Sequence, residues 1–176
     1  MSSFFTIGHS NHEFPAWLAL LRLHAVEVVV DARSSPYSKY FPQFDRELMQ
    51  RGLEQAGIRY LFFGAELGGR PENPAYYDGK GRVLYSRLCG DNHFQAAIVR
   101  LESGIERFRV AVVCGEEEAV TDPKWLDLLN LMPAGIYPHT LLCGGKQPMT
   151  YLTISLSEAF EGFHYKLVAG VVMLPA

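Results

Sequence analysis

Short apolar segments alternate with segments of helical periodicity along the first third of the chain. Residues 4–7, 26–30 and 59–63 are apolar or β-branched runs of the length of a buried β-strand. Between them, residues 14–25 and 45–56 place apolar side chains three and four positions apart, as on one face of an amphipathic helix. The strand segments are apolar almost throughout, which favours a sheet covered on both faces. A β-α-β-α-β order with short joints predicts parallel strands and an α/β fold.

Local signals set the ends of the two helices. Pro15 is compatible with a helix only in its first turn, so the first helix begins near residue 14. Asp45 is a typical residue at the start of a helix, and Glu47 adds a favourable negative charge to the first turn of the second helix. Gly57 is well placed to end that helix.

A long passage rich in glycine and proline, residues 64–82, follows the third strand. Passages of this length within a compact domain are usually functional or mobile. Residues 83–89 favour a short helix, residues 94–101 favour a longer one, and residues 109–114 form a fourth apolar strand. We therefore predict a single α/β domain over residues 1–176, with a mostly parallel sheet and helices on both faces in three layers.

The regular alternation fails after residue 118. Residues 124–131 have a short helical pattern, and residues 141–143 and 149–156 are compatible with strands. These segments do not continue the rhythm of the first part of the chain. The predicted arrangement is therefore confined to residues 4–118.

Composition excludes several classes of protein. Of the 176 residues, 48% are apolar, which supports a packed core and argues against disorder. The formal net charge of −3 offers no general basic surface, so sequence-independent binding to duplex nucleic acid is not favoured. The N-terminus lacks the pattern of a signal peptide, no apolar run is long enough to span a membrane, and the three cysteines are widely spaced. We expect a cytoplasmic protein without a membrane partner.

Polar residues follow each of the predicted parallel strands. Because the carboxyl ends of parallel strands meet at one edge of a sheet, where open α/β folds bind ligands, we predict a site at this edge. Histidine and carboxylate side chains can transfer protons, and arginine forks bind phosphate or carboxylate groups. The candidate catalytic residues are His9, Asp31 and Glu66, and the candidate ligand-binding residues are Ser10, Asn11, Arg33 and Arg70.

Several of these residues also have a purely structural interpretation. Asp31 and Arg33 could simply pair with each other, and His9 could make local hydrogen bonds. Cys114 is best interpreted as a small buried apolar residue, because the acidic residues that follow it disfavour a thiolate. His9 and Asp31 offer too few ligands to predict a metal site. Gly68 is followed by a second glycine, but without a Walker lysine or a dinucleotide fingerprint this is a weak phosphate-binding signal, and no cofactor is predicted.

Aromatic and basic residues are interleaved in the segment after the second strand. They are Arg33, Tyr37, Lys39, Tyr40, Phe41, Phe44 and Arg46. Such a pattern is typical of surfaces that stack on unpaired bases. The same rings could equally cover the end of the sheet, and both interpretations stay open.

Five short motifs in this chain resemble the bacterial family named domain of unknown function 488. They are Thr6-Ile7-Gly8-His9-Ser10-Asn11, Val30-Asp31-Ala32-Arg33-Ser34-Ser35-Pro36, Pro42-Gln43-Phe44, Gly57-Ile58-Arg59-Tyr60 and Leu67-Gly68-Gly69-Arg70-Pro71. Their order and spacing match the family over roughly residues 4–118, about two thirds of the chain. The resemblance implies one α/β domain with a Rossmann-like or flavodoxin-like layout. It also implies a pocket formed by the polar residues of the motifs, His9, Ser10, Asp31, Arg33 and Arg70.

The chain departs from the family pattern after its fourth strand. The resemblance implies a Cys, then acidic residues, then a Cys-His-Arg triplet that opens a helix. Cys114 and the acidic residues 116–118 are present, but no Cys-His-Arg occurs anywhere in the chain. Residues 119–123 can be encoded so that a displaced reading frame spells Cys-His-Arg-Ser. We therefore hypothesise a frameshift from about residue 119, with a divergent natural ending over residues 119–176 as the alternative.

Two hypotheses for function follow. In the first, the protein is an enzyme that acts on a phosphate-bearing ligand, such as a nucleotide or a nucleic-acid fragment, with activity impaired if the frameshift has removed a site element. In the second, it is a non-catalytic module that binds nucleic acid or a protein.

The two hypotheses predict different placements of the same side chains. An enzyme should show one cavity that gathers His9, Asp31, Arg33 and Arg70. A binding module should leave His9 away from any pocket and should expose the rings of Tyr37, Tyr40 and Phe41.

Overall fold

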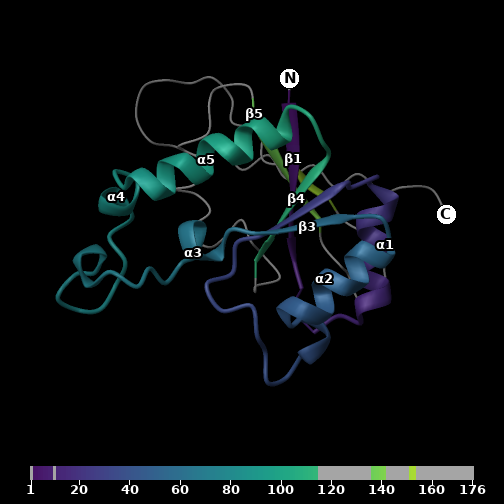
Figure 1. Cartoon of the computed structure of the whole chain (residues 1–176), viewed down its shortest axis with the longest axis horizontal. Coiled ribbons are helices and arrows are strands. Elements are labelled where there is room, and N and C mark those ends of the chain that lie inside the picture. The colour runs from purple at the N-terminus through teal and green to yellow at the C-terminus, as the bar shows by residue number, and fades with distance from the viewer. Residues whose placement is uncertain (1, 10, 115–135, 142–150, 154–176) are drawn as a thin grey trace.

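A computed structural model of the chain describes residues 2–9, 11–114, 136–141 and 151–153 (Figure 1). Strands and helices alternate over most of this part of the chain. The strands are β1 (Ser2–Gly8), β2 (Val28–Asp31), β3 (Arg59–Phe62), β4 (Val110–Cys114), β5 (Ile136–Leu141) and β6 (Tyr151–Thr153). The helices are α1 (Phe14–Leu23), α2 (Arg46–Gln55), α3 (Gly64–Leu67), α4 (Tyr85–Leu88) and α5 (Asn92–Ile105), with 3₁₀ turns η1 (Pro42–Phe44) and η2 (Pro74–Tyr76).

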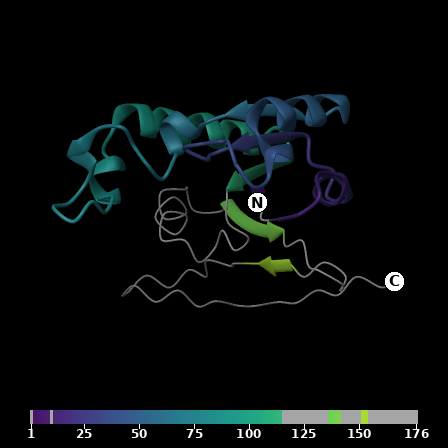
Figure 2. The ribbon, with the colours of Figure 1, turned by 90° about the horizontal axis from the view of Figure 1, so that it is seen from below.

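The strands form one sheet in the order β3-β2-β4-β1-β5-β6. Strands β1 to β5 run parallel, and β6 runs antiparallel beside β5 at the end of the sheet (Figure 2). Strand β4 lies between β1 and β2, because Gly8 pairs with Cys114 and Asp31 pairs with Val113. This register brings the carboxyl ends of the three strands to the same edge.

The predicted α/β class with a mostly parallel sheet is confirmed. The order of the strands, however, is neither the Rossmann order 3-2-1-4-5-6 nor the flavodoxin order 2-1-3-4-5. The difference arises because β4 is inserted between β1 and β2, which are neighbours in both of those layouts. Neither layout therefore describes this sheet.

Helices cover both faces of the sheet and give the three predicted layers (Figure 1). On one face, Phe5 of β1 packs in a core with Trp17 of α1 and Leu53 of α2. On the other face, Phe4 packs in a core with Leu101 of α5. Neighbouring residues of β1 enter different cores because successive side chains of a strand point to opposite faces. Each such side chain contributes roughly 1.5–3 kcal/mol when fully buried.

The predicted helix ends agree closely with the structure. Pro15 lies in the first turn of α1, and Gly57, which follows α2, has a φ of 76°. Asp45 precedes α2, but its Oδ1 accepts from the backbone N–H of Ser38 at 2.8 Å and not from a helix amide. This contact holds the preceding loop against the start of the helix.

Two boundaries differ from the prediction. Helix α1 ends at Leu23, and the Ala25 that was predicted to continue its apolar face is exposed with a φ of 49°. The buried apolar face of α1 includes Leu20 and does not extend to Ala25. Strand β2 begins and ends later than predicted, so that Asp31 is its last residue. Side-chain periodicity alone does not reveal where backbone pairing begins.

The long glycine-rich passage contains two short elements that the sequence did not predict, α3 and η2. Between η2 and α4 the chain extends away from the sheet (Figure 1). Residues 124–131, predicted as a helix, lie outside the described residues. Of the last two predicted strands, Leu141 belongs to β5 and residues 151–153 form β6. None of the helices in the described part of the chain has the length and apolarity that a membrane span requires.

Candidate functional site

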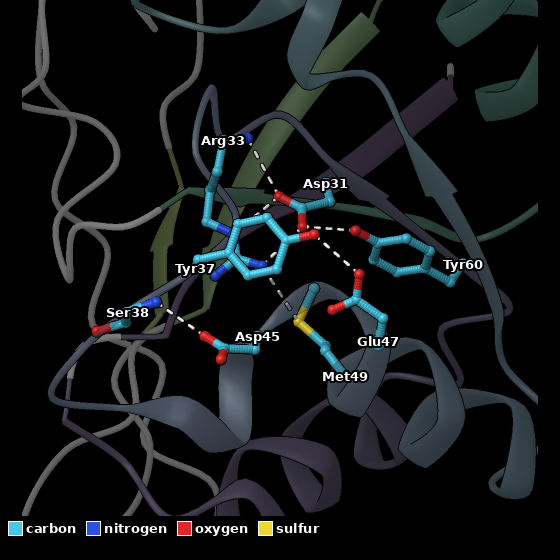
Figure 3. Close-up of polar contacts among 8 residues, drawn as sticks. All are labelled: Asp31, Arg33, Tyr37, Ser38, Asp45, Glu47, Met49 and Tyr60. Carbon is cyan, nitrogen blue, oxygen red and sulfur yellow. Dashed lines mark hydrogen bonds and ion pairs between the residues drawn. The ribbon is translucent and has the colours of Figure 1, made fainter.

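Asp31, Arg33 and the half-buried Tyr60 form a hydrogen-bonded network at the end of β2 (Figure 3). Arg33 Nε donates to Asp31 Oδ1 at 2.8 Å, and Arg33 Nη2 donates to Asp31 Oδ2 at 2.7 Å. The backbone N–H of Arg33 donates to the same Oδ1 at 3.1 Å, and the Tyr60 hydroxyl donates to Oδ2 at 2.7 Å. Asp31 is 0% exposed and Arg33 is 7% exposed. The carboxylate is therefore shared between a two-point arginine fork, a backbone amide and a phenol.

The sheet explains why these groups meet. Tyr60 on β3 pairs with Val29 on β2, two residues before Asp31, so both polar side chains lie on the face covered by α2. Arg33 Nη2 lies 4.0 Å from the sulfur of Met49 on that helix. Burial, followed by the negative charge of Asp31, raises the pKa of Tyr60 well above its ordinary value. The phenol therefore stays protonated and remains a donor.

His9 is packed in an aromatic cluster at the end of β1. Its ring stacks on Phe44 with ring centroids 4.9 Å apart and an angle of 21° between the planes. Phe44 meets Trp17 edge to face, and the Trp17 indole N–H donates to the carbonyl oxygen of Gly8 at 3.2 Å. His9 is 7% exposed. This cluster joins the end of β1 to α1 and η1.

The segment from Gly64 to Arg70 packs directly on the backbone that follows β2. A Cβ atom on Gly64 would overlap the carbonyl oxygen of Arg33, and one on Gly68 would lie 2.5 Å from the hydroxyl oxygen of Ser34. The backbone N–H of Arg70 donates to that same hydroxyl oxygen at 2.9 Å. The glycines of this passage therefore allow close approach of two backbone segments.

A hollow of about 530 Å³ opens beside this segment. We call it the Arg70 hollow. It lies between α3, η2 and the first turn of α5. Its polar lining includes Ser34, Glu66, Arg70, Asn73, Asp91 and His93.

The three acidic residues in the lining of the Arg70 hollow differ in their contacts. Glu66 Oε1 lies 3.9 Å from Arg100 Nη1, whereas its buried Oε2 has no hydrogen-bond partner among the described residues. Asp91 caps α5 by accepting from the backbone N–H groups of His93 and Phe94, and its other oxygen accepts from the Tyr76 hydroxyl at 2.6 Å. The Tyr76 hydroxyl, followed by the Phe94 amide, lowers the pKa of Asp91. Glu72, also in the lining, is exposed, where solvent screens its charge.

Arg70 is different. Its side chain is exposed, and its guanidinium has no hydrogen bond or ion pair with the residues that the structure describes. The Ser34 hydroxyl accepts from the Arg70 amide and keeps its own O–H available as a donor. The hollow therefore presents a guanidinium and a hydroxyl donor that can bind an anion.

The predicted site residues fall into two groups. Glu66 and Arg70 line the Arg70 hollow, whereas Asp31 and Arg33 bind each other and His9 lies in the aromatic cluster. Asn11 is exposed, and Ser10 lies outside the described residues. Tyr60 was not among the predicted site residues; its one signal in the sequence is its position inside the family-like motif Gly57-Ile58-Arg59-Tyr60. Ser34 had another, its position inside a family-like motif.

The family model described as "Domain of unknown function DUF488" matches residues 15–121, more than half of the chain. The chain belongs to the DUF488 family. No curated protein and no solved structure matches it. The DUF488 match contains Asp31, Arg33, Glu66 and Arg70, and it begins after His9. The predicted family membership is thus confirmed, although the first of the five motifs lies outside the matched range.

In this DUF488 protein the aromatic loop is held in shape by its own polar contacts. The Ser38 hydroxyl oxygen accepts from the backbone N–H of Tyr40 at 3.3 Å and of Phe41 at 3.1 Å. The Tyr37 hydroxyl donates to Glu47 at 2.8 Å. Tyr37 is 55% exposed and Tyr40 is 79% exposed, whereas Phe41 packs against the core. Two rings of the loop therefore face solvent and the third helps to cover the sheet.

Proposed function

We propose that this protein binds a small phosphate-bearing ligand, such as a nucleotide, in the Arg70 hollow. One observation carries the proposal: the Arg70 side chain is exposed and unpaired among the described residues, while both carboxylate oxygens of Asp91 beside it accept hydrogen bonds. A planar guanidinium binds phosphate oxygens through two parallel hydrogen bonds. The location at the carboxyl edge of parallel strands is the usual place for a ligand in an α/β fold.

The residues around Arg70 fit this ligand class. The O–H of Ser34 and the imidazole of His93 supply further donors for phosphate oxygens. Of the predicted catalytic residues His9, Asp31 and Glu66, only Glu66 lines the hollow, so we propose ligand binding and assign no catalytic step. Asp31 and Arg33 then serve as support, because Nε and Nη2 of Arg33 donate to the Asp31 carboxylate, which also accepts from Tyr60.

A thermal-shift screen against nucleotides and sugar phosphates tests the proposal. A bound ligand should raise the melting temperature of the wild type, because it stabilises the folded state alone. Arg70→Ala should abolish this shift. Arg107→Ala is the matched control, since Arg107 is also exposed but lies beyond the other end of α5. No response to any ligand, or a response that Arg70→Ala leaves intact, contradicts the proposal.

A second function, binding of single-stranded nucleic acid, is favoured by the exposure of Tyr37 and Tyr40. Exposed aromatic rings stack on unpaired bases, each worth roughly 1–3 kcal/mol. Lys39 between them is exposed and supplies a positive charge for the phosphate backbone. The packing of His9 on Phe44, outside the lining of the Arg70 hollow, agrees with the placement expected for a binding module.

Fluorescence anisotropy with labelled single-stranded oligonucleotides tests this second function. Tyr40→Ala should weaken binding about tenfold, the effect of losing one stacked base. Val99→Ala on α5 provides the control, because Val99 is 58% exposed on a different element. Absence of binding by the wild type, or equal binding by the two variants, removes this candidate.

A further inference from the structure

A continuous chain of contacts leads from the buried network to the Arg70 hollow. The Tyr60 hydroxyl donates to Oδ2 of Asp31, and the Asp31 carboxylate accepts from both the guanidinium and the backbone N–H of Arg33. The carbonyl oxygen of Arg33 lies so close to Gly64 that it would overlap a Cβ atom there. The next residue, Ser34, accepts a hydrogen bond from the backbone amide of Arg70.

The first part of this chain fixes the Arg33 backbone. Arg33 binds Asp31 Oδ1 through its backbone N–H at 3.1 Å and its Nε at 2.8 Å. Rotation of the Arg33 backbone would therefore separate both donors from the carboxylate at once. Tyr60, 2.7 Å from Oδ2, stops the carboxylate from turning with them. Because Asp31 is 0% exposed and Arg33 is 7% exposed, a lost bond between them would leave a polar group without water to replace its partner.

The second part transmits that position to the hollow. Neither Gly64 nor Gly68 leaves space for a Cβ atom against the backbone of Arg33 and Ser34. Close-packed backbone segments of this kind move together, because no void is available to absorb a shift. The position of the Arg33 carbonyl and the Ser34 hydroxyl therefore sets the position of the segment that carries Glu66 and Arg70.

We propose that Tyr60 and Asp31 are positioning residues of the Arg70 hollow and act through the backbone of Arg33 and Ser34. Their relation to ligand binding rests on the function proposed above. Their control of the segment from Gly64 to Arg70 does not, and it can be measured without any ligand.

Hydrogen exchange of single backbone amides, followed by NMR, makes that measurement. In Tyr60→Phe the Arg70 amide should exchange about fivefold faster, the factor expected when one hydrogen bond is weakened. The Arg82 amide is the internal control, because it is bonded to Asp78 at 2.9 Å in a separate loop. Equal exchange of the Arg70 amide in wild type and Tyr60→Phe overturns the proposal.

A double-mutant comparison tests the route. Ser34→Ala removes the acceptor of the Arg70 amide and should accelerate its exchange at least as much as Tyr60→Phe. If Tyr60 acts through Ser34, the double variant should exchange no faster than Ser34→Ala alone. Additive acceleration would show that Tyr60 acts by another route and would refute the assignment. If Tyr60→Phe proves poorly folded, Asp31→Asn makes the same test, because the amide keeps only one of the two acceptor oxygens that bind Arg33 and Tyr60. Exchange of the Arg70 amide equal to that in the wild type would again overturn the proposal.

Titration with inorganic phosphate separates this proposal from the proposed function. Tyr60→Phe should weaken phosphate binding about fivefold, matching the loosened Arg70 amide, whereas Arg70→Ala should abolish it. If the wild type does not bind phosphate, the proposed function fails for this probe, and the exchange experiment still decides the positioning role. If phosphate binds equally to wild type and Tyr60→Phe, the positioning role fails while the proposed function stands.

Discussion

The carbonyl oxygen of Arg33 occupies the place where a side chain on Gly64 would begin. Two segments that are far apart in sequence thus touch backbone to backbone at the carboxyl edge of the sheet. This contact links the buried Asp31 network to the hollow that holds Arg70.

Gly64→Ala should destabilise the protein by about 1–3 kcal/mol, the usual cost of an extra methyl group in a packed interior. The new Cβ atom would overlap the backbone oxygen of Arg33, which cannot move aside as a flexible side chain can. Gly79→Ala is the control, because no atom lies within 4 Å of a Cβ at that position. Urea unfolding of both variants gives the comparison, and equal midpoints would disprove the close contact.

Arg33→Met should cost about 3–5 kcal/mol of unfolding free energy, because it leaves the Asp31 carboxylate buried without its charged partner. Arg82→Met breaks an ion pair of similar length, 2.8 Å, on a side chain that is 73% exposed. This control should change stability little, because water replaces the lost contact. Chemical denaturation of the two variants measures the contrast. A small effect at Arg33 would mean that the buried pair is not needed for the fold.

The fold class was predictable from the sequence because apolar periodicity records which faces are buried. Phe94, Ala97, Ile98 and Leu101 stand on one face in the sequence pattern and are all buried in α5. Cys114 was likewise interpreted correctly as a buried apolar residue. The strand order was not predictable, since the pattern of β4 is the same whether it lies beside β1 alone or between β1 and β2.

The candidate site was harder to predict, because residue type does not reveal what a polar side chain contacts. Asp31 and Arg33 were candidates for ligand chemistry and also for a mutual pair, and the structure shows the pair. The glycines at 64 and 68 serve tight packing, which no local pattern distinguishes from a loop that binds phosphate. Tyr60 carried no chemical signal of its own and depends on a neighbouring strand for its partner.

The stability contributed by Tyr60 should disappear at high pH. Its pKa is raised in the folded state, so the folded protein keeps the phenol protonated at pH values where the unfolded chain ionises it. The contribution is therefore fully present below pH 10 and is lost as the pH rises above that value. The difference in unfolding free energy between wild type and Tyr60→Phe should shrink from pH 9 to pH 11, because a tyrosine in the unfolded chain ionises with a pKa of about 10. A constant difference over this range contradicts the raised pKa. Comparison of the two proteins cancels the titration of the other tyrosines.

We propose that the reading frame changes near residue 119, and the coding DNA tests this directly. The frame displaced within the codon of Ala119 should spell Cys-His-Arg and continue open. The family match ends at residue 121, close to this point, which supports the proposal. A stop codon at once in the displaced frame, or the absence of the triplet, would establish that residues 119–176 are a natural ending. If the displaced frame is open and contains the triplet, restoring the frame by one inserted or deleted base should yield a chain with a longer family match.

The central place of β4 has a consequence for how the chain folds. β4 is the hydrogen-bonded neighbour of both β1 and β2, and its residues come about a hundred positions after those of β1. Until β4 has been synthesised, no hydrogen-bonded strand connects β1 to β2 and β3, so the N-terminal elements cannot yet share one sheet. Long-range pairing of this kind slows folding and leaves strand edges exposed meanwhile. Nascent chains that stop before residue 110 should therefore depend on chaperones, whereas chains that extend past Cys114 contain all four strands of the family-like core.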